Sequence, residues 1–516
     1  MGSAQGPVKE VFLNVDKLWQ WDRGVYQRFP PAEKVPVSGL EPGGPGSWDA
    51  RITSIYGTVL VEDGKFRMWY TAMPDAQSYD ENADVMVACY AESDDGYQWH
   101  KPDLKLTGQN RFPGNNLIQF PGAILSVVRA LPNTNAKYLA VAMLNEGMTS
   151  AIPDVCDDGR YRYITGTWIM ASDDGLTWRQ YSDGPIVCHG DVAVLFADHA
   201  AGRYLLYQKF GAQHGLHHRR SFMGLESTDG LHWEGYNGGA HSSRYCFMAD
   251  DYDDLIAAQR GFMITDYYGV AVHRTGDLYV AAESMFHMSL PLNMRYGQNS
   301  DGLGYVRLAY SNDGFHWRHP KGRPGWLEYG KPGEFDAGFI VTASAFTEHG
   351  DDLLLYYGGN RDYHGWCINE QFQMRRDIPL EEQRNMAWIG AAAHTKRDRF
   401  ASLSCTWRGS FVVESTAPAG RDSLFINALC GRDGTVRVAI YDGAGAELHG
   451  NNRWNFKPLP GFGLEDCIPV TGDVMRAPVR FRNAHIGNLP AGKPVFLQFE
   501  LFRSEAFAFE WDTAAT

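Results

Sequence analysis

The chain has 516 residues, of which 44% are apolar and 13% aromatic, and it carries a formal net charge of −14. This length exceeds one ordinary hydrophobic core, so two domains are expected. Because no Arg-rich stripe offsets the acidic balance, nucleic acid and anionic membranes are not expected as partners. No apolar run approaches the roughly 18 residues that cross a bilayer.

The spacing of the cysteines and the N-terminal sequence indicate in which cellular compartment the protein is expected. The eight cysteines are scattered, without a Cys-x-x-Cys pair, which favours a reducing compartment and argues against a zinc site. No apolar stretch of the signal-peptide kind follows Met1, so a cytoplasmic location is expected; secretion with a removed signal would leave the same sequence. No cofactor or metal is expected, although a central Ca²⁺ stays an open alternative. The oligomeric state stays open.

A turn motif organises the chain from Gly46 onward, after one strand-like piece at 9–15 and a Pro/Gly-rich loop. The motif S-x-D-G-x-x-W recurs four times, at 93–99, 172–178, 227–233 and 311–317. Asp-Gly is typical of tight turns between strands, because glycine accepts positive φ. These turns are interpreted as scaffold, with each tryptophan packed between neighbouring sheets.

A repeated apolar strand defines the fold class. The strand begins at Phe66, Tyr138, Tyr204, Leu278 and Leu353, at spacings of 72, 66, 74 and 75 residues. Five units of near-constant pitch, each of about four strands, predict an all-β fold with a five-bladed β-propeller over residues 1–400.

Two segments depart from this repeat. Residues 367–385 lack the strand pattern and predict a short helical insertion in the fifth blade. Short alternating strands separated by Asp-Gly turns predict a β-sandwich over 401–516.

Acidic residues near the inner strands are the candidate catalytic groups, because the innermost strands of a propeller converge on its axis. Asp49 and Asp336 each lie 17 residues before their second strand, in the similar strings Gly-Ser-Trp-Asp-Ala and Gly-Glu-Phe-Asp-Ala. Glu334 stands beside the second acid, and blade three supplies Asp191. Blade two offers no acid there; Ser126 is its nearest polar residue.

Paired carboxylates are what glycoside hydrolysis needs, since one protonates the leaving oxygen while another attacks the sugar or activates water. Burial and mutual repulsion push their pKa values apart. The sequence therefore predicts Asp49, Asp191, Asp336 and Glu334 as catalytic residues. The candidate substrate-binding residues are Trp48, Arg51, His189, Asp266, Glu283 and His364. The polar stretch of His214, His217, His218, Arg219 and Arg220 is interpreted as a solvated rim and not as a metal site.

The five-blade period, the S-x-D-G-x-x-W turns and the trailing β-domain resemble the five-bladed propeller glycosidases. These include glycosyl hydrolase family 32 (fructosidases and invertases) and the related family 43-like arabinanase and xylosidase group. The resemblance implies that Asp49 is nucleophile or base. The transition-state-stabilising Asp of blade two has no counterpart here, Asp191 stands where blade three carries a Glu acid, and the Trp-Met-Asn-Asp-Pro signature of fructosidases is absent.

The expected function is therefore a glycoside hydrolase or transglycosidase acting on a furanoside or short oligosaccharide. A catalytically silent sugar-binding propeller is one alternative, which the missing blade-two acid favours. A lyase or isomerase that uses the same funnel is the other, because propellers host unrelated chemistries.

Overall fold

The computed structural model describes residues 8–50, 52–74, 86–106, 112–122, 125–144, 166–187, 191–214, 217–235, 244–288, 301–364, 388–443 and 457–513. The chain forms two compact units. Unit 1 comprises Met1–Pro31, Arg274–Tyr279 and Thr395–Thr516; unit 2 comprises Ala32–His273 and Val280–His394. The sequence boundary at 400 falls near Thr395, whereas residues 8–31 belong with the C-terminal segment.

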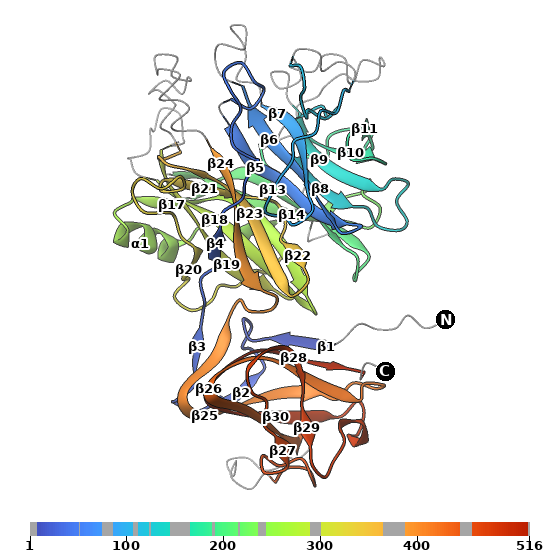
Figure 1. The fold of residues 1–516 in the computed structure, drawn as a ribbon, viewed down its shortest axis with the longest axis vertical. Helices are drawn as coiled ribbons and strands as arrows, with labels where there is room; N and C mark the ends of the chain where they lie inside the picture. The colour runs from blue at the N-terminus through green and yellow to red at the C-terminus, as the bar shows by residue number, and fades with distance from the viewer. Residues whose placement is uncertain are drawn as a thin grey trace. The chain divides into compact units, whose positions relative to one another are not determined.

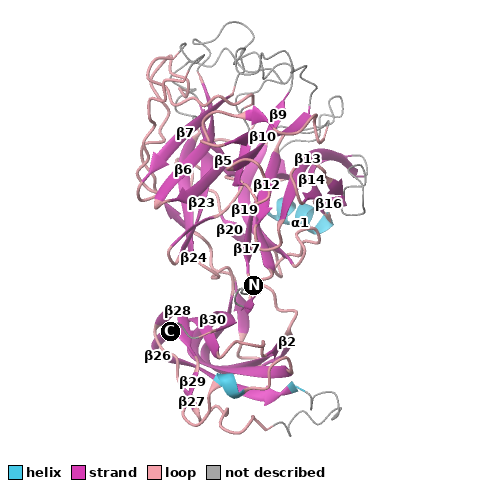
Figure 2. Ribbon diagram, turned by 90° about the vertical axis from the view of Figure 1, so that its right-hand side faces the viewer, coloured by secondary structure: helices cyan, strands magenta, loops and turns pink. Residues whose placement is uncertain are grey.

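Unit 2 is a five-bladed β-propeller, which confirms the predicted fold class (Figures 1 and 2). Blade 1 holds β5 (Ile52–Glu62), β6 (Lys65–Met73) and β7 (Val87–Ser93). Blade 2 holds β8 (Leu125–Arg129), β9 (Tyr138–Leu144), β10 (Gly166–Ser172) and β11 (Arg179–Gln180). Blade 3 holds β12 (Ala193–Asp198), β13 (Arg203–His214), β14 (His217–Ser227), β15 (Glu234–Gly235) and β16 (Arg244–Phe247).

Blade 4 holds β17 (Ile264–Thr275), β18 (Leu278–Met288), β19 (Gly302–Ser311) and β20 (Gly325–Leu327), and α1 (Asp251–Gln259) precedes it. Blade 5 holds β21 (Phe339–Thr342), β22 (Thr347–His349), β23 (Asp352–Asn360) and β24 (Ile389–Lys396). Its outer strand is β4 (Glu33–Val35), which pairs with β24. An N-terminal strand thus closes the ring, where the sequence predicted only a loop. The predicted insertion at 367–385 lies outside the described residues.

Hydrogen bonds between blades link several of the inner strands. Thr58 Oγ1 on β5 accepts from Val127 N on β8 at 2.9 Å. Ser126 Oγ on β8 accepts from Leu195 N on β12 at 3.1 Å. Oγ of Ser344, just after β21, lies 2.6 Å from Oγ1 of Thr58. These contacts fix which blades are neighbours, and they give Ser126 a structural role.

The four S-x-D-G-x-x-W turns share one hydrogen-bond pattern. In the first, Ser93 Oγ accepts from Gly96 N at 2.9 Å, and Asp95 Oδ1 accepts from the backbone N–H groups of Tyr97 and Gln98. Trp99 Nε1 donates to Gly96 O at 3.1 Å. The φ angle of Gly96 is +79°, as an Asp-Gly turn requires.

The glycine carbonyls of these turns also hold the blades together. Trp69 of blade 1 donates to Gly175 O of blade 2 at 2.6 Å. The Tyr207 hydroxyl of blade 3 donates to Gly314 O of blade 4 at 2.8 Å, and the Tyr356 hydroxyl of blade 5 donates to Gly96 O of blade 1 at 2.9 Å. Three of the four turns are thus joined through the glycine carbonyl to an aromatic side chain of an adjacent blade, which supports the interpretation of the motif as scaffold.

Unit 1 contains one seven-stranded sheet and a two-stranded ladder. The sheet holds β1 (Val8–Val11), β2 (Leu18–Trp21), β3 (Tyr26–Arg28), β25 (Ser402–Thr416), β26 (Ser423–Asp442), β28 (Asp473–Pro478) and β30 (Pro494–Asp512). The ladder pairs β27 (Cys467–Ile468) with β29 (Arg480–Phe481), and a short 3₁₀ helix covers Ile486–Asn488. Bulges shift the long ladders at Cys405/Arg408 and Cys430/Thr435. The β-sandwich arrangement stays a prediction.

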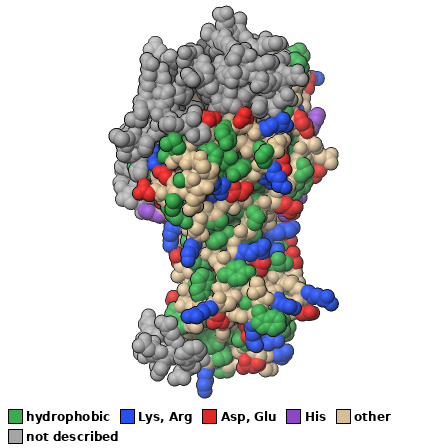
Figure 3. All heavy atoms as spheres, turned by 90° about the vertical axis from the view of Figure 1, so that its left-hand side faces the viewer, with side chains coloured by type: hydrophobic (Ala, Val, Ile, Leu, Met, Phe, Trp, Pro, Cys, Tyr) green, Lys and Arg blue, Asp and Glu red, His purple; other side chains and the backbone are tan. Residues whose placement is uncertain are grey.

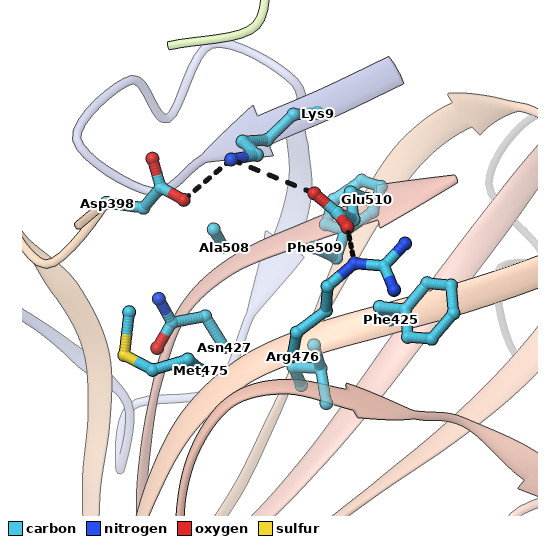
Figure 4. A pocket seen from close by; sticks show the side chains of 10 residues that line it. Lys9, Asp398, Phe425, Asn427, Met475, Arg476, Ala508, Phe509 and Glu510 are labelled. Atoms are coloured by element: carbon cyan, nitrogen blue, oxygen red, sulfur yellow. Dashed lines mark hydrogen bonds and ion pairs between the residues drawn. The ribbon is translucent and has the colours of Figure 1, made fainter. Parts of the chain in front are cut away.

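Charged side chains join β1 to the rest of unit 1 (Figure 4). Lys9 Nζ lies 2.8 Å from Asp398 and 3.7 Å from Glu510. Arg476 pairs with Glu510 and lies over the Phe425 ring. The charges in this cluster pair with one another, which is typical of a structural site.

The surface drawn in Figure 3 carries acidic and basic side chains interspersed among its described residues. No helix in the described part of the chain is long and apolar enough to cross a membrane.

Candidate functional site

A cluster of polar and aromatic side chains lies where the inner strands begin. Tyr56 of β5 and Tyr268 of β17 have ring centroids 6.3 Å apart. Blades 1 and 4 are not neighbours in the ring, so this contact reaches across the central axis. The axial cluster, as it is called below, consists of Tyr56, Asp191, Lys209, Arg220, Asp266 and Tyr268.

Asp191 and Lys209 form the charged pair of blade 3 in this cluster. Asp191 precedes β12 and is 60% exposed, whereas Lys209 on β13 is 3% exposed. Lys209 Nζ lies 3.0 Å from Asp191 Oδ1 and 4.2 Å from the centre of the Tyr268 ring. Desolvation opposes ionisation of Asp191, but the Lys209 ammonium and the Arg220 guanidinium prevail and hold its pKa below the usual value. Asp191 is therefore an accessible, ionised carboxylate.

Asp266 on β17 behaves in the opposite way. It is fully buried, and its Oδ2 accepts from Arg220 Nη1 at 2.8 Å. Its Oδ1 has no hydrogen-bond partner among the described residues. Burial raises the pKa of Asp266 despite the nearby guanidinium. Two carboxylates in one cluster thus have pKa values shifted apart.

Aromatic and imidazole groups complete the cluster. The Tyr268 hydroxyl lies 2.6 Å from His364 Nε2, and Tyr56 donates to the Tyr268 carbonyl at 3.4 Å. Phe286 and Phe339 pack edge-on against the Tyr268 ring. Such rings offer faces on which an apolar ligand surface stacks.

Asp49 and Asp336, both predicted as catalytic, occupy equivalent buried ion pairs. Each is 1% exposed. Lys101 donates to Asp49 Oδ2 and Lys34 to Asp336 Oδ2, both at 2.6 Å. Lys34 lies on β4, the outer strand of blade 5. Lys101 directly follows His100, which forms a β-bridge with Glu92 of β7 at the outside of blade 1. The matching strings that surround the two acids thus reflect a repeated structural pair, and their catalytic role stays a prediction.

The remaining predicted residues lie in other surroundings. Glu283 is fully buried, where it accepts from Arg307 Nε at 2.7 Å beside His319. Exposed Glu334 accepts from Lys331 N at 2.7 Å in a turn. Trp48 packs edge-on against Phe112. Arg51 and His189 lie outside the described residues.

The structure therefore brings Asp191, Asp266 and His364 together and sets the other described candidates apart. Sequence reasoning missed Tyr56, Lys209, Arg220 and Tyr268. Arg219 and Arg220 had been interpreted as a solvated rim, but they lie on β14, where Arg219 is buried against Asp254. Two arginines in a strand that must bury one face were the available signal, because buried guanidinium groups require acidic partners.

Among the described residues, no three His, Cys, Asp or Glu side chains are grouped as a metal ion requires.

No family model and no curated protein matches this sequence. Solved structures with a similar chain path include an N-acetylgalactosamine deacetylase from F. plautii, with 15% identity over 73% of this chain and 97% of that chain and a TM-score of 0.42. A β-1,2-mannobiose phosphorylase from Listeria innocua has 12% identity, coverages of 68% and 91%, and a TM-score of 0.41. A glycosyl hydrolase from Bacteroides ovatus has 15% identity, coverages of 67% and 94%, and a TM-score of 0.38. Similarity at this level does not transfer an activity to this chain.

Proposed function

We propose that this chain is a carbohydrate-active enzyme that cleaves a glycosidic bond at the propeller axis, with Asp191 as its ionised catalytic carboxylate. The observation that carries the proposal is the exposed Asp191 carboxylate beside the buried Lys209 ammonium at 3.0 Å. Perturbed ionisable groups grouped with a specific charge partner are typical of catalytic sites. The surrounding tyrosines suit stacking against a sugar ring.

In the proposed reaction, Asp191 attacks the anomeric carbon or removes a proton from the water that does so. The glycosidic C–O bond breaks, and the leaving oxygen takes a proton from the Tyr268 hydroxyl, which His364 supports at 2.6 Å. If Asp191 attacks the sugar, water then displaces it and gives its second proton to Tyr268; if Asp191 acts as base, the proton it took from water passes on to Tyr268, and in both routes the water hydroxyl stays on the released sugar. The buried Asp266 acts through Arg220 as a positioning residue.

The test is turnover of a panel of 4-nitrophenyl furanosides and pyranosides by the wild type, Asp191→Asn and Asp173→Asn. Asp173 is a matched control, since it is an exposed aspartate with an arginine, Arg179, at 3.8 Å in a blade turn. We expect D191N to lower kcat by roughly 10²–10⁴-fold while it keeps the circular dichroism spectrum of the folded protein, and D173N to leave kcat unchanged.

Wild-type kcat in D191N would refute the assignment. Sugar binding without turnover in the wild type would instead support a silent sugar-binding propeller. An unsaturated product would identify a lyase.

A further inference from the structure

The Lys209 ammonium is a buried cation with more N–H donors than the described residues use. An ammonium group has three N–H donors. Among the described residues, Lys209 Nζ has no aligned hydrogen bond, and its close partners are Asp191 Oδ1 at 3.0 Å and the Tyr268 ring at 4.2 Å. Burying a charge costs several kcal/mol unless partners satisfy it. The cluster therefore holds donors that a ligand can use.

Two cations lie in the cluster, and each has an acidic partner. Lys209 and Arg220 are two cations, and the exposed acid that faces them is Asp191. The second acid, Asp266, is enclosed and pairs with Arg220 at 2.8 Å, and burial raises its pKa. Arg219 adds no net charge, because Asp254 pairs with it at 2.9 and 2.7 Å. The buried positive charge of Lys209 is therefore opposed by a carboxylate that is itself exposed.

The aromatic rings of the cluster increase the effect of that charge. The Tyr268 ring faces both cations, with the Lys209 Nζ 4.2 Å and the Arg220 guanidinium carbon 5.9 Å from its centre. Phe286 also faces Arg220 at 5.3 Å. Apolar surroundings lower the local dielectric, so an anion placed here interacts more strongly than in water.

From this arrangement we propose that the axial cluster binds a substrate bearing an oxyanion, with Lys209 as its direct donor and Arg220 as the second cation. The oxyanion is either a carboxylate carried by an acidic sugar or a free phosphate that joins the reaction. The proposal rests on the proposed function, since it names the substrate class of the same site.

Calorimetric titration of the whole chain with D-glucuronate, D-glucose and inorganic phosphate tests the proposal without requiring turnover. We expect glucuronate to bind on the order of tenfold or more tightly than glucose, as a charge-assisted hydrogen bond predicts. Tight phosphate binding that excludes glucuronate would identify phosphate as the source of the oxyanion. Equal affinity for glucuronate and glucose with no phosphate binding, or no binding of any probe, would overturn the proposal.

Lys209→Met removes the ammonium with little change in shape, and Lys209→Arg retains the charge. We expect the preference for the anion to disappear in K209M and to persist in K209R, with far-ultraviolet circular dichroism as the check on folding. If K209M does not fold, Lys209→Gln, which keeps a polar group at this position without the charge, supplies the same test. An anion preference that survives in folded K209M or K209Q overturns the role of Lys209. We expect D191N to keep the preference for the anion. If D191N also keeps wild-type turnover, the proposed function is wrong while the oxyanion proposal stands, so the two failures can be told apart.

Discussion

The ammonium of Lys101 donates a 2.6 Å hydrogen bond to Oδ2 of Asp49, a carboxylate that is 1% exposed. The same distance separates Lys34 from Asp336 in blade 5. Removing one partner of a buried ion pair leaves an uncompensated charge, which costs about 3–5 kcal/mol when both partners are enclosed. Because both lysines keep some exposure, we expect Lys101→Met and Lys34→Met each to lower the free energy of unfolding by about 2–4 kcal/mol.

Urea unfolding followed by circular dichroism measures this loss. Lys331→Met is the control, because Lys331 is exposed and forms no ion pair among the described residues. A loss below about 0.5 kcal/mol, the range of ordinary surface substitutions, would contradict the structural role of the pairs.

The blade turns should make stability depend on pH in the acidic range. Backbone N–H groups of Gln98 and Tyr97 hold the pKa of Asp95 below its usual value. A depressed folded-state pKa adds stability above the unfolded pKa of about 3.9, and that stability is lost as pH falls through the folded value. We therefore expect Asp95→Asn to lower the melting temperature at neutral pH, with the difference from wild type disappearing at low pH.

The neighbouring Asp94→Asn serves as the control, since Asp94 is 92% exposed. Melting curves of the three proteins between acidic and neutral pH decide the matter. A D95N difference that is constant with pH, or shared by D94N, would show that the Asp95 charge is not responsible.

Lys209 should set the acidic limb of the activity profile. Its ammonium is one of the groups that hold the pKa of Asp191 down, so the wild type should keep Asp191 ionised at low pH. In Lys209→Met this pKa rises, and kcat/KM should begin to fall at a higher pH than in the wild type. Superimposable acidic limbs would show that Asp191 does not govern the reaction or that Lys209 does not tune it.

The buried pair of Glu283 and Arg307 tests whether Glu283 stabilises the fold or binds substrate. Arg307 bonds Glu283 at 2.7 Å, contacts Asp253 and donates to the Tyr267 hydroxyl at 2.5 Å, and it is 1% exposed. We expect Glu283→Gln to lower the free energy of unfolding by about 3 kcal/mol, because it leaves a buried guanidinium undercompensated. An increased KM with unchanged stability would instead support the substrate-binding role predicted from sequence.

Gly175 should be intolerant of a side chain. A Cβ there would lie 2.7 Å from Cζ2 of the buried Trp69, and the φ angle of +81° is unfavourable for alanine. We expect Gly175→Ala to cost about 2–4 kcal/mol, from the clash and the left-handed backbone together. Gly184→Ala is the control, since a Cβ added there would have no atom within 4 Å and the backbone has no positive φ at that position. Similar melting temperatures for both variants would contradict the contact between the blades.

Periodic features of this protein were predictable from the sequence by itself. The five strands that begin near Phe66, Tyr138, Tyr204, Leu278 and Leu353 are the second strands of the five blades. Their spacing and the Asp-Gly turns depend on local backbone geometry, which neighbouring residues along the chain specify. Asp191 and Asp266 also emerged as candidates because they lie at the start of inner strands.

Only the tertiary structure decided which charges meet. Asp49 and Asp336 lie in similar local sequences, as two catalytic acids of a repeat would. In the structure each pairs with a lysine, 52 and 302 residues away in the chain. Lys209 and Arg220 of blade 3 became candidates because both face the ring of Tyr268 on blade 4. Whether a carboxylate is ionised and accessible depends on burial and on partners brought from distant segments. These are properties of the closed ring, and no local pattern in the chain encodes them.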